Sequence, residues 1–198
     1  LIELPTTPKS QSGDLYAHYD FEGSYNETMG NLQSVIPYQN TTLQISRGVD
    51  GNGYLSIATS SGSNSYAVIP YDSLLDGFNL TLDFWIRTRN YNYSQNILSK
   101  ASSPSGNYFN YKIFADADEP FLYEDFVVTC HDTDNNSHSA VNYVSDDSWN
   151  HIVVTIKEYS IAFYINGIFV DSLYWSSAPI SQGIYDIILG DPFQDVTL

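Results

Sequence analysis

The stretch WNHIVVTIKEYSIAFYINGIFVDSL, residues 149–173, decides the fold class. Apolar and polar side chains alternate along its first two arms, 151–157 and 160–165, and this period of two is typical of strands with one buried face. Asn166-Gly167 follows, the pair that most readily takes positive φ at both centres of a type I′ hairpin turn. A third arm, 168–173, continues the meander. Three such strands cannot cover their own apolar face, so the sequence predicts a second sheet packed over it and an all-β, two-sheet antiparallel β-sandwich.

The same alternation predicts the hydrophobic core. Residues 78–87 form a further strand whose apolar positions should pack with those of the meander, while Thr81 and Thr155 face outward. The predicted core residues are Leu80, Leu82, Phe84, Ile86, Ile152, Val154, Ile156, Ile161, Phe163 and Ile165.

Composition supports the same class and excludes some partners. The 198 residues include 17 Tyr and 10 Phe, which favour strands, and no stretch keeps a helical apolar period, so we expect one domain with almost no helix. No apolar run is long enough to predict a transmembrane segment. The net charge of −16 would repel a phosphate backbone and an anionic membrane surface, so nucleic acid is excluded as a partner.

Several motifs resemble those of one family. The strings WNHIVVTI (149–156) and IAFYINGIFVDS (161–172) resemble the central signature of laminin G-like domains in the concanavalin A-like lectin/glucanase superfamily. Further motifs stand in that family's order: YDFEG at 19–23, GVDGNGYLSI at 48–57, FNLTLDFWIR at 78–87, ILSK at 97–100 and IILG at 187–190. The resemblance implies a jelly-roll sandwich over residues 14–198, with its first strand at 15–21, preceded by an extension of residues 1–13. It does not choose among lectins, adhesion modules, structural domains and enzymes.

The carboxylate pattern argues against catalysis. Glucanases of this superfamily place acidic residues on alternate positions of one strand, where they serve as nucleophile and acid/base. No E-x-D-x-E or E-x-D-x-x-E string occurs here, and no G-x-S-x-G nucleophile elbow occurs either. His151 follows the family's W-x-H pattern, so we expect it to be packed and hydrogen-bonded beside Trp149. The chain is therefore predicted not to be an enzyme.

Sequons supply the argument for an extracellular or cell-surface location, because the lone Cys130 has no partner for an internal disulfide and is expected to be a buried thiol. The N-x-S/T pattern predicts N-glycosylation at five positions, although a chain rich in Asn, Ser and Thr produces some by chance. These positions are Asn26, Asn40, Asn79, Asn92 and Asn135.

Two groups of residues are candidate metal ligands. The family resemblance implies a calcium site at the edge of the sandwich, with hard oxygen ligands drawn from loops and strand ends. The candidates are Asp20, Glu22, Asp50 and Asp191, with Asn52 and Asp195 nearby in the same loops. The segment 131–138 carries His131, Asp132, Asp134 and His138, and a solvated polar turn is the favoured interpretation over a transition-metal site.

Aromatic residues in or beside loops are candidates for stacking on a sugar ring. Tyr91, Tyr93, Tyr174 and Trp175 have this placement. The same residue types are also enriched in protein contacts, and the sequence alone leaves both interpretations open.

The N-terminal extension is a candidate donor segment. The family's closing strand is shortened here to residues 193–198, which predicts unpaired backbone groups and an apolar groove. Leu1, Ile2 and Leu4 could fill such a groove on a neighbouring copy, which would give a head-to-tail homopolymer. The alternative is that the extension folds back onto its own sheet.

Two hypotheses about function follow. In the first, the chain is a non-catalytic, N-glycosylated structural or adhesive surface protein, a pilus-like filament subunit or a protein that contacts other surface proteins. In the second, it is a carbohydrate-binding lectin-like module that could depend on calcium.

Overall fold

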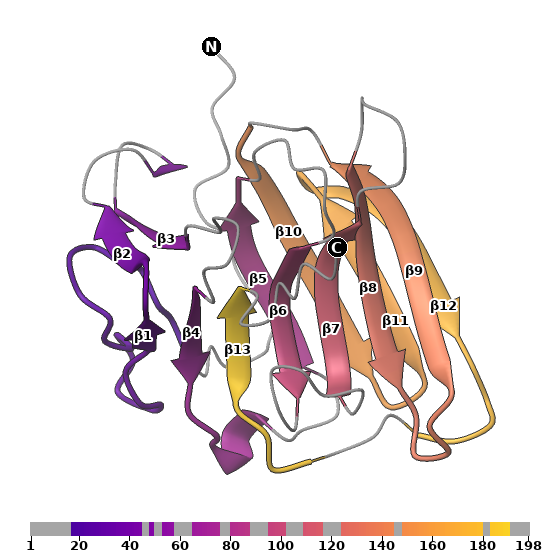
Figure 1. Cartoon of the computed structure of the whole chain (residues 1–198). Coiled ribbons are helices and arrows are strands. Elements are labelled where there is room, and N and C mark those ends of the chain that lie inside the picture. The colour runs from indigo at the N-terminus through magenta and orange to yellow at the C-terminus, as the bar shows by residue number, and fades with distance from the viewer. Residues whose placement is uncertain are drawn as a thin grey trace, which may run out of the picture.

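The computed structural model describes residues 17–44, 48–49, 53–57, 65–75, 80–87, 95–101, 109–116, 124–144, 148–179 and 183–190. Within these ranges the chain forms an antiparallel sandwich of two main sheets, as the sequence predicts (Figure 1). The larger sheet has seven strands in the order β1 (Ile36–Tyr38), β4 (Tyr66–Ile69), β13 (Ile187–Gly190), β6 (Gln95–Ala101), β7 (Phe109–Asp116), β8 (Glu124–His131) and β9 (Ser137–Val144).

The second sheet contains the meander. Its four strands follow the order β12 (Ile168–Tyr174), β11 (Ser160–Ile165), β10 (Asn150–Lys157) and β5 (Leu80–Ile86). A separate two-stranded sheet pairs β2 (Thr41–Gln44) with β3 (Tyr54–Ile57). Helical structure in the described ranges consists of the 3₁₀ turn η2 (Ser73–Leu75) and a single 3₁₀ residue at position 49. Figure 1 shows the four-stranded sheet lying behind strands β6 to β9 of the larger one.

Turn chemistry and pairing explain the register of the meander. Asn166 and Gly167 have φ values of 51° and 78°, the positive pair that a type I′ turn requires, and the turn closes β11 onto β12. Strand β10 then lies between β11 and β5, with Val154 opposite both Phe163 and Leu82. This pairing places the apolar alternation of the three strands on one face.

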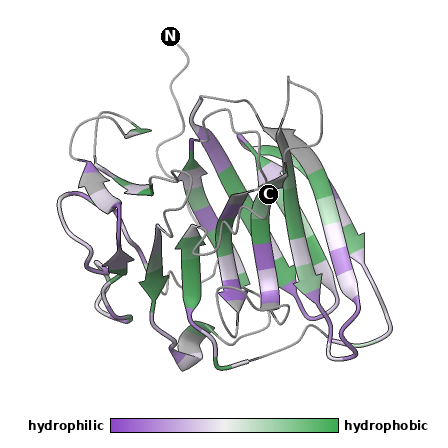
Figure 2. Cartoon of the chain, in the orientation of Figure 1, coloured by the Kyte–Doolittle hydropathy of each residue, from purple (hydrophilic) through white to green (hydrophobic). Residues whose placement is uncertain are grey.

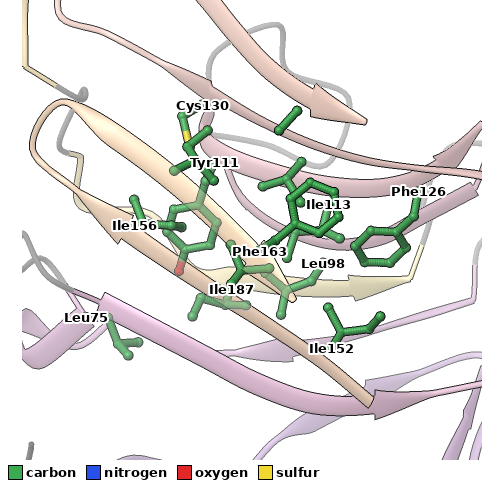
Figure 3. Packing of buried hydrophobic residues seen from close by; sticks show 14 of the residues in the cluster. Leu75, Leu98, Tyr111, Ile113, Phe126, Cys130, Ile152, Ile156, Phe163 and Ile187 are labelled. Atoms are coloured by element: carbon green, nitrogen blue, oxygen red, sulfur yellow. The ribbon is translucent and has the colours of Figure 1, made fainter. Parts of the chain in front are cut away.

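The core lies between the two sheets. On β10 and β11 the predicted core residues are all buried, and Phe163 packs against Phe126 of the opposite sheet with ring centroids 6.3 Å apart (Figure 3). Cys130 is also buried there, as predicted. Figure 2 shows hydrophobic and hydrophilic residues alternating along the strands.

Strand β5 departs from the prediction in degree. Its inward residues Leu80, Leu82, Phe84 and Ile86 pack against the core but are only half-buried, because β5 is an edge strand of the four-stranded sheet. Thr81 is exposed and Thr155 faces outward, so the predicted register is correct.

The N-terminal part of the domain differs from expectation. Residues 17–21 are not a strand, although the family resemblance placed the first strand at 15–21; residues 15 and 16 lie outside the described ranges. Instead the buried Glu27 organises this region by accepting backbone N–H groups from His18 at 2.7 Å, Met29 at 2.7 Å and Asn31 at 2.8 Å. Desolvation alone would raise the pKa of Glu27, but these hydrogen bonds outweigh it and lower the pKa to about 2.

Candidate functional site

The outer face of the four-stranded sheet carries exposed aromatic side chains. Alternation on β5 turns Asp83 and Trp85 away from the core, and their exposures of 47% for the Asp83 side chain and 44% for Trp85 show that solvent reaches both. On the neighbouring strand β10, His151 lies directly opposite Trp85 and Val153 lies opposite Asp83. Four outward residues from two strands therefore form one continuous surface.

Three of these residues make a fixed unit. The imidazole of His151 stacks on the indole of Trp85, with ring centroids 4.9 Å apart and planes 29° from parallel. His151 Nε2 donates to Asp83 Oδ1 at 2.7 Å, and the His151 backbone N–H donates to Asn166 Oδ1 at 2.9 Å. The histidine is thus held on two sides, and it in turn fixes the orientation of the indole and of the carboxylate.

The aromatic surface continues across the sheet. Val153 lies opposite Tyr164 of β11, and Tyr164 lies opposite Phe169 of β12. The two rings make an edge-to-face contact with centroids 5.5 Å apart, and Phe169 remains 54% exposed. Because β11 and β12 shift register between Phe163 and Tyr164, the irregularity aims these two rings at the same surface.

An indole and a carboxylate, both held by one imidazole, can bind a ligand that has an apolar face and hydroxyl groups. The flat apolar face of an indole stacks on the C–H face of a sugar ring, while a nearby carboxylate accepts hydrogen bonds from hydroxyl groups. Since Asp83 and His151 already hold each other, both keep their direction without a ligand, which lowers the entropic cost of binding.

Within the segment 131–138, residues 133–137 are exposed, as a solvated turn requires, but the segment is built around one buried carboxylate. Asp132 is 2% exposed and accepts hydrogen bonds from the backbone N–H groups of Asp134 and Asn136, from His138 Nε2 at 2.9 Å and from Ser177 Oγ at 3.2 Å. Desolvation alone would raise the pKa of Asp132, but these hydrogen bonds outweigh it and hold the pKa well below its usual range. His138 also stacks on Trp175 at 4.4 Å, so the cluster joins the β8–β9 connection to the segment after β12.

Of the four aromatic residues predicted from the sequence to bind sugar, the structure describes Tyr174 and Trp175. Tyr174 ends β12 and is 76% exposed, so it is available to a ligand. Trp175 is half-buried, with its ring stacked on His138 and its Nε1–H donated to Ala178 O at 2.8 Å. Tyr91 and Tyr93 lie outside the described residues. A sugar-binding role of these four residues stays a prediction.

The calcium prediction also stays open. Asp20 accepts the backbone N–H of Glu22 at 3.0 Å, whereas Asp50, Asn52, Asp191 and Asp195 lie outside the described residues. Among the described residues, no three His, Cys, Asp or Glu side chains gather as a metal site.

Three of the five sequons fall in described parts of the chain. Asn26, Asn40 and Asn135 are exposed, whereas Asn79 and Asn92 lie outside the described residues. The donor-segment residues Leu1, Ile2 and Leu4 lie outside them as well. No helix in the described ranges is long and apolar enough to cross a membrane.

Sequence reasoning missed the unit of Trp85, Asp83 and His151. A signal was available for the first two, because the alternation that places Phe84 and Ile86 inward places Asp83 and Trp85 outward. A tryptophan on the outward face of a strand indicates a binding surface, because large aromatic residues are enriched at such surfaces. For His151 the expectation of a packed, hydrogen-bonded ring is correct, but its ring partner is Trp85; Trp149 instead contacts Tyr54.

A model of the concanavalin A-like lectin/glucanases superfamily matches residues 61–195, more than half of the sequence. The chain belongs to this superfamily. The match covers β4 to β13, and therefore the whole four-stranded sheet with its aromatic face. A comparison with curated protein sequences gave no match.

Solved structures similar to this superfamily member include toxin binding domains. The "Botulinum Neurotoxin Type G Receptor Binding Domain" superposes with a TM-score of 0.62 at 19% identity, covering 88% of this chain and 43% of that chain. A structure titled "Cell entry of botulinum neurotoxin type C is dependent upon interaction with two ganglioside molecules" has a TM-score of 0.68 at 14% identity, covering 93% and 44%. The "binding domain of Paraclostridial Mosquitocidal Protein 1" has a TM-score of 0.57 at 18% identity, covering 83% and 41%.

These likenesses concern the fold. This chain spans less than half of each of the three solved chains, and the identities are low. The match therefore supports the two-sheet jelly-roll architecture of the superfamily and does not transfer the ligand of any neighbour.

Proposed function

We propose that this chain is a non-catalytic, carbohydrate-binding, lectin-like module that acts outside the cell or at its surface. The observation that carries the proposal is the unit of Trp85, His151 and Asp83 on the exposed face of the four-stranded sheet. It combines an accessible indole with a fixed carboxylate, the two elements that sugar recognition needs. Membership in a superfamily that includes lectins, and neighbours described as receptor-binding domains, agree with it.

The test is sugar binding by the purified chain, measured on a glycan array and then by calorimetry. Trp85→Ala removes the stacking surface, and Asp83→Asn keeps the shape while weakening the acceptor. We expect each change to lower affinity at least about tenfold, which corresponds to a loss of roughly 1.4 kcal/mol in binding free energy. Tyr159→Ala is the matched control, because Tyr159 is a 39% exposed aromatic residue at the β10–β11 turn, outside the unit.

Thermal unfolding of each variant separates lost binding from lost folding. If wild type binds no glycan on the array, or if W85A binds as well as wild type and Y159A, the proposal is wrong. Calorimetry with and without a chelator also decides whether binding depends on calcium, the cofactor predicted near Asp20 and Glu22.

We also propose that the sequon asparagines carry N-linked glycans. Exposure of Asn26, Asn40 and Asn135 supports it, since a glycan needs an accessible acceptor. The mass of protein from a eukaryotic secretory host, measured before and after enzymatic removal of N-glycans, tests it; an unchanged mass contradicts it.

Head-to-tail assembly through residues 1–13 stays a prediction, because those residues lie outside the described ranges. It requires that wild type assemble at high concentration and that a variant lacking residues 1–8 remain monomeric. Light scattering on both proteins decides the matter, and equal behaviour rules out the donor segment.

A further inference from the structure

The outer face of the four-stranded sheet has two parallel rows that cross all four strands. The first row holds Asp83, Val153, Tyr164 and Phe169, which lie opposite one another in pairs across β5, β10, β11 and β12. The second row lies two residues away on β5, β10 and β11 and three residues away on β12, where the register shifts, and its members are all small. These are Thr81, Thr155, Ala162 and Ser172.

The contrast in side-chain size shapes the surface. Tyr164 and Phe169 stand above the sheet at one end of the first row, and Trp85 stands beside its other end, on β5. Because the side chains of the second row are small, the surface along that row lies closer to the backbone of the sheet than the surface over the aromatic rings. Hydroxyl groups of Thr81 and Ser172 lie in this row, so hydrogen-bonding groups accompany the aromatic surface at both edges of the sheet.

The distance between the aromatic ends sets the length of the ligand. From β5 to β12 there are three interstrand spacings, which amount to about 14 Å. One pyranose ring cannot span that distance, whereas a short chain of linked rings can. An isolated sugar would use Trp85 and leave Tyr164 and Phe169 uncovered, although Phe169 exposes 54% of its surface.

Charge limits the kind of sugar. Asp83 presents a carboxylate on the same face of β5 as Trp85, and the whole chain carries a net charge of −16, which disfavours an acidic sugar. Arg87 lies two positions beyond Trp85 and already has an interaction of its own. Uncharged hydroxyl-rich rings fit this surface better than sialylated ones.

We infer that the ligand is an uncharged oligosaccharide chain that lies across the four strands (Figure 1). It runs from Trp85 on β5 to Tyr164 on β11 and Phe169 on β12. This inference rests on the proposed function and adds to it the length, the charge and the direction of the ligand. It predicts that affinity rises with the number of sugar rings, because a longer chain crosses Val153 and reaches Tyr164 and Phe169.

The experiment compares oligosaccharide ladders by calorimetry. The probes are glucose and N-acetylglucosamine, their linear β-1,4-linked oligomers of up to five rings, and a sialylated trisaccharide beside its unsialylated parent. A chain of three or more rings of the sugar that binds should bind about tenfold more tightly than one ring, the gain expected from one further aromatic contact. The sialylated probe should bind less well than its parent.

Two variants separate the ends of the surface. Phe169→Ala should remove the gain from chain length, and Trp85→Ala should weaken ligands of every length. Tyr159→Ala, outside both rows, should match wild type with every probe.

Equal affinity for one ring and for longer chains, a wild-type gain retained in F169A, or preference for the sialylated probe overturns this inference while the lectin function stands. Absence of binding to every probe here and to the array overturns the inference together with the proposed function. Protein capture through Trp85 without sugar binding would assign the face to a protein partner and would overturn both as well.

Discussion

Replacing Phe163 by Ala should cost about 3–5 kcal/mol of unfolding free energy, the range for a fully buried aromatic residue. Phe163 is 0% exposed, and its ring lies 6.3 Å from that of Phe126, which reaches across from the opposite sheet. The site cannot collapse easily around the missing ring, because Phe163 is paired on both sides, with Val154 of β10 and with Asp171 of β12. The cost should therefore lie in the upper part of this range.

Urea unfolding followed by tryptophan fluorescence measures this cost. With a slope of about 2 kcal/mol per M, a cost of about 4–5 kcal/mol should lower the midpoint by about 2–2.5 M, and the slope itself should stay unchanged. Phe169→Ala is the matched control, because it is the same substitution on the adjacent strand at a residue that is 54% exposed, and it should cost less than about 1 kcal/mol. Equal midpoint shifts in the two variants would show that Phe163 does not join the two sheets.

Three further predictions concern buried polar groups and the thiol. The pKa of Glu27 is lowered to about 2 in the fold from an ordinary 4.5, so the ionised carboxylate stabilises the folded state above about pH 4.5 and this stabilisation is lost as pH falls towards 2. In Glu27→Gln, the unfolding midpoints at pH 7 and pH 3 should therefore differ less than they do in wild type. Burial raises the pKa of the Cys130 thiol, so a thiol reagent at pH 8 should label it only in denaturant, and rapid labelling of native protein would contradict its placement. Asp132→Asn should lower the melting temperature and speed amide exchange at residues 134–136, whereas Asp134→Asn, at an exposed side chain, should change neither.

The sheet register could be predicted because it depends on the local sequence pattern. The period of two in 151–165 and the positive-φ turn at Asn166-Gly167 depend only on neighbours in sequence, and both occur as expected. The incomplete burial of β5 could not be predicted in the same way, since it depends on which strand ends the sheet. The absence of a strand at 17–21 likewise follows from Glu27, a side chain that binds backbone N–H groups on either side of itself.

The candidate site shows where local pattern stops being informative. Outward placement of Trp85 follows from alternation on its own strand, but its contact with His151 joins residues far apart in sequence. That contact exists only because β5 pairs with β10, and a shift of one residue would turn His151 inward. Asp132 illustrates the same limit, because the hydroxyl of Ser177 that completes its hydrogen bonds comes from the segment after β12.

The unit of Trp85, His151 and Asp83 also bears on the stability of the sheet edge. Among the described strands, β5 pairs only with β10. Its attachment to the sheet therefore depends on the hydrogen bonds between these two strands and on side-chain contacts between them. Two of those crossings are the Asp83–His151 hydrogen bond and the Trp85–His151 stack. A ligand that covers these residues should therefore slow opening of β5, and amide exchange on this strand should fall when sugar is added. Exchange that falls equally in W85A would mean that the sugar binds elsewhere on the domain.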